Sequence, residues 1–137
     1  SVLENGGMSL YTTNFETQEN FKVEAKVGRS LHKIPNTNLI SYISKQNDSL
    51  WEIKSFNISS SEIKFITKTL ANSEDMCWLA NGTLLMGKED ALYKLSPNKD
   101  VDWIEVASLK DYGITNITRL AISPDGTKLA LVGEKNK

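Results

Sequence analysis

Residues 123–129 read Ser-Pro-Asp-Gly-Thr-Lys-Leu, a turn that leads into an apolar strand. Related stretches are Ile-Pro-Asn-Thr-Asn-Leu-Ile at residues 34–40 and Leu-Ala-Asn-Gly-Thr-Leu-Leu at residues 79–85. The Asn or Asp of each turn stands at position 36, 81 or 125, so the repeat steps are 45 and 44 residues. A strand-rich repeat of about 40–50 residues is typical of propeller blades with four strands each. The repeat therefore predicts an all-β fold built from blades.

The rest of the chain also has the pattern of short strands. Runs rich in Val, Ile, Leu, Thr, Tyr and Trp are broken by Asn, Gly, Ser, Asp and Pro, and no apolar period of 3.6 residues is sustained. We therefore expect twelve strands and almost no helix. The expected strands span residues 8–14, 21–27, 30–34, 39–45, 49–56, 63–69, 75–79, 84–88, 91–96, 103–108, 117–123 and 128–133.

Alignment of the turns divides these strands into blades. The expected divisions are the end of a preceding blade at 1–27, whole blades at 28–72 and 73–115, and the first half of a blade at 116–137. Closed propellers have about four to eight blades. About three four-stranded antiparallel blades are therefore expected to belong to a larger ring, six-bladed in the simplest case, or to be a half that pairs with another copy.

The two ends of the chain have their own expectations. Residues 1–3 are expected to finish a second strand, with Glu4-Asn5-Gly6-Gly7 as the hairpin turn, because Asn-Gly favours the positive φ of such turns. The charged residues 133–137 resemble a natural C-terminus.

Aromatic residues indicate how neighbouring blades pack. Leu10-Tyr11, Leu50-Trp51 and Leu92-Tyr93 follow one another at steps of 40 and 42 residues and are expected to open the third strand of each blade. Aromatic side chains bury about 150–250 Å² each and dominate such contacts. The expected anchors between blades are Trp51, Trp78, Tyr93 and Trp103.

The stretch Ser-Pro-Asp-Gly-Thr-Lys-Leu-Ala-Leu-Val at residues 123–132 resembles the signature of the TolB-like propeller family. In that family the Ser-Pro-Asp-Gly turn joins the first and second strands of a blade. Proline presets φ, Asp accepts local backbone N–H groups and Gly takes a positive φ. The second turn has Ala80 in place of Pro, and the first has Thr37 in place of Gly. The turn residues are Pro35, Asn36, Asn81, Gly82, Pro124, Asp125 and Gly126.

The resemblance covers about residues 8–133 and carries implications for function. It implies a propeller of six or seven blades that is most often exported and most often a scaffold for binding proteins. A periplasmic or secreted protein of the bacterial envelope is therefore expected, its leader being absent from this chain.

Composition narrows the classes of function. Sixteen basic and 17 acidic side chains give a net charge of −1, which offers no electrostatic case for binding nucleic acid or an anionic membrane. No apolar run approaches the ~20 residues that span a bilayer, and the start at Ser1 has no signal-peptide pattern. With one cysteine, Cys77, and one histidine, His32, the chain is expected to hold no disulfide, metal or other cofactor.

Four charged residues are the candidate binding site. Asp75 and Arg119 stand six residues before their turn Asn or Asp, and Arg29 and Glu74 stand seven before. The first strand of each blade borders the central channel, so these residues are expected to ring one channel mouth and hold a protein segment or a small polar ligand by charge-assisted bonds. The alternative is that Arg29 and Arg119 simply pair with Glu74 and Asp75 across adjacent blades, which contributes little at a surface.

Catalytic sites are not expected. Cys77 and His32 take equivalent places on separate blades, which gives no reason for the contact that a nucleophilic pair needs, and Cys77 fits a buried apolar residue. A pair of carboxylates could hydrolyse a glycoside, but the acidic residues are expected to be solvated. These are Glu16, Glu19, Glu24, Asp100 and Asp102.

The sequence therefore favours a non-enzymatic scaffold whose partner is another protein or the remaining blades. One alternative is the gating domain of a serine-peptidase-type enzyme, whose catalytic part would lie elsewhere because no Gly-x-Ser-x-Gly motif occurs in these residues. Another alternative is a propeller that senses a small ligand in its channel.

Overall fold

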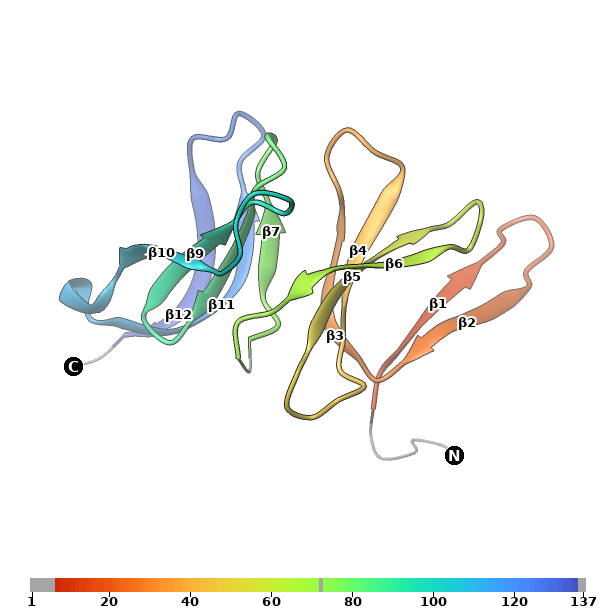
Figure 1. Ribbon diagram of the computed structural model, residues 1–137, viewed down its shortest axis with the longest axis horizontal. Coiled ribbons are helices and arrows are strands. Elements are labelled where there is room, and N and C mark those ends of the chain that lie inside the picture. The colour runs from red at the N-terminus through yellow and green to blue at the C-terminus, as the bar shows by residue number, and fades with distance from the viewer. Residues whose placement is uncertain (1–6, 72, 136–137) are drawn as a thin grey trace.

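The computed structural model describes residues 7–71 and 73–135, and antiparallel strands make up most of it (Figure 1). Each of the twelve expected strands overlaps one observed strand, and the 3₁₀ turn Lys110–Tyr112 is the one helical element among the described residues. The all-β class is confirmed. The strands are β1 (Ser9–Thr13), β2 (Asn20–Ala25), β3 (Val27–Lys33), β4 (Leu39–Ser44), β5 (Glu52–Asn57), β6 (Ile63–Lys68), β7 (Met76–Trp78), β8 (Leu84–Lys88), β9 (Ala91–Leu95), β10 (Ile104–Ser108), β11 (Ile114–Ile122) and β12 (Leu129–Lys135).

The strands form four sheets, of which two are four-stranded meanders and two are hairpins. The N-terminal hairpin is β1–β2, the first sheet is β3-β4-β5-β6, the second sheet is β7-β8-β9-β10, and the C-terminal hairpin is β11–β12. All pairings are antiparallel. Figure 1 shows the N-terminal hairpin, the first sheet and the second sheet following one another along the long axis, and the C-terminal hairpin overlaps the second sheet in this view. The described strands do not close into a ring.

The expected strand at residues 1–3 and most of its turn, residues 4–6, lie outside the described residues, as do residues 136–137. The division of the chain into blades is an interpretation of the sheet grouping and stays a prediction.

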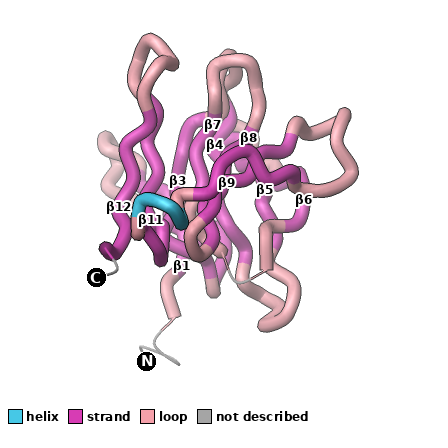
Figure 2. Tube along the Cα trace, turned by 90° about the vertical axis from the view of Figure 1, so that its left-hand side faces the viewer, coloured by secondary structure: helices cyan, strands magenta, loops and turns pink. Residues whose placement is uncertain are grey.

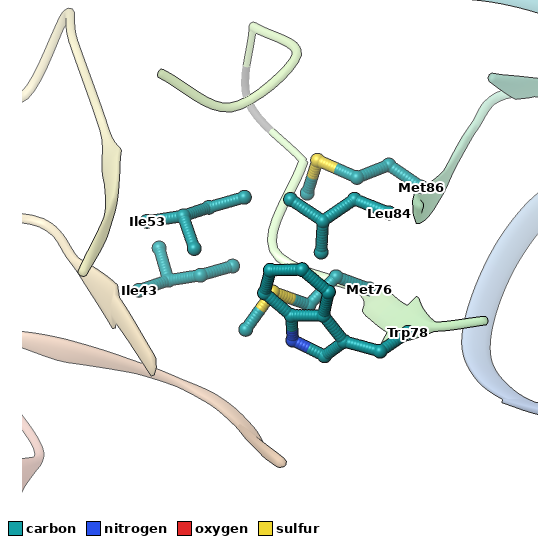
Figure 3. Packing of buried hydrophobic residues seen from close by; sticks show 6 residues of the cluster. All are labelled: Ile43, Ile53, Met76, Trp78, Leu84 and Met86. Carbon is teal, nitrogen blue, oxygen red and sulfur yellow. The ribbon is translucent and has the colours of Figure 1, made fainter. Parts of the chain in front are cut away.

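An apolar cluster joins the first and second sheets (Figure 3). Ile43 and Ile53 point from β4 and β5 toward the second sheet, and Trp51 and Trp103 pack against the cluster while half-buried. The members that the second sheet supplies are Met76, Trp78, Leu84 and Met86. Burial of each such side chain stabilises the fold by about 1.5–3 kcal/mol. The expectation that Trp51, Trp78 and Trp103 anchor adjacent sheets is confirmed.

A second cluster joins the second sheet to the C-terminal hairpin. Cys77 and Leu85 contribute from one side, and Ile117 and Leu120 from the other. The two sheets approach closely at Gly87, where a Cβ would lie 2.6 Å from Cγ2 of Ile117. Cys77 is 2% exposed, so its expected role as a buried apolar residue is confirmed.

A third cluster joins the N-terminal hairpin to the first sheet. Tyr42 and Phe56 are buried there, and Leu10 and Val23 of the hairpin pack against them. Beside this cluster the carboxylate of Glu24 accepts hydrogen bonds from the Tyr42 hydroxyl (2.6 Å), from Ser44, and from the Gln46 amide (3.2 Å), and it lies 3.4 Å from Lys54 Nζ.

The expectation that Glu24 is solvated is wrong, because its side chain is only 11% exposed. Burial alone would raise the pKa of Glu24, but the hydrogen bonds from Ser44, Tyr42 and Gln46 and the charge of Lys54 together hold the pKa below its ordinary value. Burial, and then the bond to Glu24, raise the pKa of Tyr42. Glu24 is therefore an ionised structural link between two sheets.

The expected match of Leu50-Trp51 with Leu10-Tyr11, which lies within β1, and with Leu92-Tyr93 is also wrong. Tyr93 pairs with Met86 in the middle of β9, whereas Trp51 precedes β5. The reason is loop length, because β4 and β5 are joined by residues 45–51 and β8 and β9 by residues 89–90 alone. Tyr93 is half-buried and stands outside the three clusters that the described residues form.

The three repeated turns differ in conformation. Gly82 and Gly126 have φ of 88° and 75°, and each follows an Asn or Asp whose side chain accepts the next Thr N–H. In the first turn Asn36 takes the positive φ (62°), and Thr37 N donates to Ile34 O at 3.3 Å. A turn with Pro as its second residue and a positive φ at its third residue is a type II turn, and Asn tolerates that third position. Asn36 therefore supplies the positive φ one position earlier in its turn than Gly82 and Gly126 do in theirs.

Candidate functional site

The first strands of three sheets lie side by side. β3, β7 and β11 each begin a sheet and carry the candidate residues, with Arg29 in β3, Glu74 and Asp75 directly before β7, and Arg119 in β11. Figure 1 shows β7 between β3 and β11. The repeat predicts this neighbourhood, since equivalent positions of successive sheets meet at one edge.

Arg29 and Asp75 form a two-point ion pair. Nε of Arg29 donates to Oδ1 of Asp75 at 3.0 Å and Nη2 donates to Oδ2 at 2.7 Å. The Asp75 side chain is 7% exposed and that of Arg29 is 31% exposed. The hydrogen bond to Asp75 raises the pKa of Arg29. This two-point geometry positions both side chains and is stronger than an exposed pair.

Glu74 is paired as well. Its Oε1 accepts the backbone N–H of Arg29 at 2.9 Å, and its Oε2 lies 3.0 Å from Nζ of Lys45. Lys45 also lies over the ring of Trp51, 4.4 Å from the centroid, a cation–π contact. The backbone oxygen of Glu74 accepts a 2.6 Å bond from Ser30 Oγ. Both acids of the candidate site are therefore neutralised by neighbouring cations.

Arg119 differs from the other three residues. It is exposed, and no hydrogen bond or ion pair joins its side chain to another of the described residues 7–71 and 73–135. Its φ is 57°, in the left-handed region, at an irregularity between Thr118 and Ala121 in the β11–β12 pairing. A non-glycine residue in this region costs on the order of 1–3 kcal/mol and is enriched at functional sites. Ion pairing across the sheets therefore covers Arg29, Glu74 and Asp75 but leaves Arg119 available.

Two open cavities adjoin these residues. One, of about 390 Å³, is lined by Arg29, Glu74, Asp75, the β8–β9 turn and Thr115–Thr118. The other, of about 340 Å³, is lined by Arg29, Asp75 and Arg119, with His32 at its side. Both volumes fall in the lower range of small-molecule sites, which is about 300–1,000 Å³. The structure thus brings all four candidate residues to one pair of cavities.

Some residues of the site have no signal in the sequence. Lys45 directly follows β4 and reaches Glu74 from the neighbouring sheet, a contact that no local spacing predicts. Asn116 and Glu89 line the larger cavity, and both have positive φ, 52° and 56°. Ser30 is the exception, because it stands six residues before its turn Asn, the repeat position of Asp75 and Arg119, and the repeat therefore predicts it at the same channel mouth.

Cys77 and His32, the two residues weighed as a nucleophilic pair, both have shifted pKa values. Burial raises the pKa of the Cys77 thiol to about 11, and burial lowers the pKa of His32. A thiol with so high a pKa stays protonated at neutral pH and is a poor nucleophile. The described part of the chain contains no group of three or more His, Cys, Asp or Glu side chains placed to hold a metal ion. It also contains no helix long and apolar enough to cross a membrane.

No protein-family model matches the chain, and no curated protein matches it. The resemblance to the TolB-like family therefore depends on residues 123–132 and on the repeat.

Proposed function

We propose that the chain is about three blades of a TolB-like β-propeller that acts, without catalysis, as a periplasmic or secreted scaffold for another protein of the bacterial envelope. Two four-stranded meanders and two hairpins that pack face to face support the propeller arrangement. Binding takes place where β3, β7 and β11 meet. The partner presents an acidic segment to Arg119.

One observation carries this proposal. In a site where Arg29, Glu74 and Asp75 neutralise one another with Lys45, the guanidinium of Arg119 lies beside a cavity and forms no ion pair with another described residue. Arginine presents several donors in a fixed fork that matches a carboxylate. The paired residues give the site a fixed shape, and Arg119 gives it the capacity to bind an anion. An Asp or Glu of a partner, or its C-terminal carboxylate, fits that requirement.

A peptide array tests the proposal. Labelled chain is applied to an array of random decapeptides, and the strongest binders are then titrated in solution. We expect them to contain Asp or Glu, and we expect Arg119→Ala to weaken binding about tenfold, since a charge-assisted contact contributes about 1.5–3 kcal/mol. The matched control is Lys22→Ala, which removes an exposed cation from β2 and should leave the affinity unchanged. Binders without acidic residues, an absence of binders, or equal effects of the two substitutions would contradict the proposal.

The size of the cavities favours a second candidate, the sensing of a small carboxylate. The cavity beside Arg119 has a volume of about 340 Å³, enough for a small organic acid. A thermal-shift screen of dicarboxylic acids discriminates the two candidates. Stabilisation by a free acid that Arg119→Ala abolishes favours sensing, and binding of peptides alone favours the scaffold.

A further inference from the structure

The N-terminal hairpin repeats the outer half of the first sheet. In β1–β2, Ser9 pairs with Ala25 and Thr13 with Asn20, and 43 residues later Glu52 pairs with Lys68 and Phe56 with Ile63. The register shift falls at corresponding places, between residues 10 and 11 and between residues 53 and 54.

The connecting loops agree as well. Asn14 N donates to Glu19 O and Asn57 N donates to Glu62 O, both at 2.9 Å. Gln18 and Ser61 both have φ of 64°. The N-terminal hairpin is therefore equivalent to β5–β6, the third and fourth strands of a sheet, and lacks a first and second strand among the described residues.

The C-terminal hairpin repeats the inner half of the first sheet. Ala121 pairs with Ala130 in β11–β12, and 89 residues earlier His32 pairs with Ser41 in β3–β4. Near their turns, Ser123 N donates to Lys128 O and Ile34 N to Leu39 O. The C-terminal hairpin is therefore the first and second strands of a sheet, and among the described residues it lacks a third and fourth.

Within residues 7–71 and 73–135, the two hairpins leave complementary edges open. β4 pairs with β5 through one edge of each strand. β12 is the equivalent of β4 and β1 the equivalent of β5, yet these two strands lie far apart, on opposite sides of the first sheet (Figure 1). Figure 2 views the molecule from the side that carries β12. Unpaired strand edges of this kind are templates for pairing with another chain.

Apolar surface is exposed where the missing strands of the N-terminal hairpin belong. A groove of about 410 Å³ lies over β3 and β4 and is lined by Leu31, Ile40 and Ile58, with His32, Lys33 and Asn38. Leu31 is 53% exposed. Met76 of the second sheet is the equivalent of Leu31 of the first. Leu31 pairs with Tyr42 of β4, and Met76 pairs with Met86, the equivalent residue of β8. Met76 is fully buried, so the first sheet is only half covered on this face.

The cluster in Figure 3 indicates which side chains would cover the face of the first sheet around Leu31. There Ile43 and Ile53, directly opposite each other, pack against the second sheet and meet Met76. The equivalent of Ile53 is Leu10, which already packs against the first sheet. The equivalent of Ile43 is Val132, which is 56% exposed at the far end of the molecule. The face over Leu31 thus lacks one side chain of the expected set, and this chain carries that side chain on its other hairpin.

We propose that a second copy of this chain fills the gap, with its β12 pairing antiparallel to β1 so that the two hairpins form one shared four-stranded sheet. In the register of β4–β5, Val132 of one copy lies opposite Leu10 of the other, and Ala130 lies opposite Thr12. Val132 covers Leu31. The same contact made in return closes the pair around a two-fold axis, as symmetric oligomers do.

Counted over the described residues of each copy, the closed pair has six four-stranded sheets, because each copy supplies two whole sheets and the copies share two more. That number falls within the range of about four to eight blades of closed propellers. The pairing uses strand edges and apolar faces and is independent of the binding proposed at Arg119. An Arg119→Ala variant is therefore expected to keep the same assembly, and peptide binding can fail without affecting the mass.

The mass in solution tests the proposal. Size-exclusion chromatography with multi-angle light scattering is expected to give twice the 15.3 kDa mass of the chain. Val132→Asp places a charge in the shared sheet and is expected to raise the dimer dissociation constant at least about tenfold, a change of about 1.4 kcal/mol. The matched control is Val101→Asp, at a residue that is 93% exposed in a loop, and it should remain dimeric. Circular dichroism checks that both variants are folded.

Cysteine pairs test the register. Thr12→Cys with Ala130→Cys is expected to form a disulfide between copies, visible as a covalent dimer on a non-reducing gel, while Cys77 is too buried to compete. Thr13→Cys with Ala130→Cys is the control, because a shift of one residue puts the two side chains on opposite faces. A monomer at every concentration, a ladder of larger species, or equal cross-linking by both pairs would overturn the proposal.

Discussion

The indole Nε1–H of Trp78 donates a 2.8 Å hydrogen bond to Oγ of Ser41, across the boundary between the second and first sheets. Ser41 is fully buried, and its Oγ donates in turn to the backbone oxygen of His32 at 3.1 Å. This chain of bonds runs beside an otherwise apolar cluster. Because hydrophobic contacts are non-directional, a satisfied polar link of this kind fixes the relative position of two sheets.

The first prediction concerns this link. Trp78→Phe keeps most of the aromatic surface but removes the N–H donor, so Ser41 loses one of its two bonds. We expect the free energy of unfolding to fall by about 1–3 kcal/mol, the cost of leaving a buried polar group partly unsatisfied. Unfolding in denaturant measures this decrease in the free energy of unfolding.

Trp103→Phe is the matched control for that prediction. It also removes an indole hydrogen bond, to Lys68 O at 3.0 Å, but Trp103 is only half-buried and water can replace the lost partner. We expect a smaller loss, under about 1 kcal/mol. Equal losses in the two variants would contradict the role given to the Trp78–Ser41 bond.

The second prediction concerns the closest approach of two sheets. Gly87→Ala places a Cβ 2.6 Å from Cγ2 of Ile117, and that methyl group is held by a stiff β-branched side chain. We expect a loss of about 1–3 kcal/mol, the usual cost of overpacking a core.

A double variant and a control distinguish this clash from the loss of glycine itself. Ile117→Ala removes the clashing methyl, so the combined cost of Gly87→Ala and Ile117→Ala should be less than the sum of the two. Gly7→Ala has open space around the new Cβ and should be neutral. Additive costs at Gly87 and Ile117 would disprove the clash.

The strands could be predicted from the sequence because their signals are local. Turn residues such as Gly126, together with short β-rich runs, are sufficient to locate the strands to within about three residues, which is typical of such boundaries. The repeat also predicts which residues from different sheets are neighbours, and local signals cannot do this. Arg29 and Asp75 stand at similar distances from the turns of their own sheets, so the repeat predicts that they are neighbours, as their ion pair confirms.

Contacts that break the repeat were not predictable. Lys45 and Glu74 meet only because two sheets pack face to face, and Glu24 is buried only because its hairpin covers Ser44 and Lys54. The error at Tyr93 has a different origin, because loops of unequal length shift the register without changing the spacing of the motif.

The third prediction concerns stability in acid. The pKa of Glu24 lies below its ordinary 4.5 in the folded chain, so ionised Glu24 favours folding. Its contribution is fully present above about pH 4.5 and is lost as the pH falls through the folded-state pKa. We expect Glu24→Gln to lose stability at pH 7 and to show a shallower decline below pH 4.5 than the parent chain.

Tyr42→Phe refines this test, because it removes one of the donors to Glu24 and keeps the carboxylate. Urea unfolding at pH 7, 4 and 3 measures all three proteins. The decline of Tyr42→Phe should lie between those of the parent chain and Glu24→Gln. If Glu24→Gln and the parent chain decline equally in acid, Glu24 is not the ionised link described above.

The fourth prediction compares Arg29, which is ion-paired with Asp75, with Arg119, which has no such partner among the described residues. Arg29→Ala leaves the carboxylate of Asp75, 7% exposed, without its two-point partner, and should cost about 3 kcal/mol, as expected when one side of a buried ion pair is removed. Arg119→Ala removes no bond to a described residue, and it keeps the Cβ and therefore the same left-handed backbone strain, so its effect on stability should stay within about 0.5 kcal/mol. Asp75→Asn in the Arg29→Ala background removes the stranded charge and should restore part of the loss, which a double-mutant cycle measures. Equal losses in the free energy of unfolding for Arg29→Ala and Arg119→Ala would mean that both guanidinium groups are structural. That result would contradict the proposal that Arg119 binds a ligand.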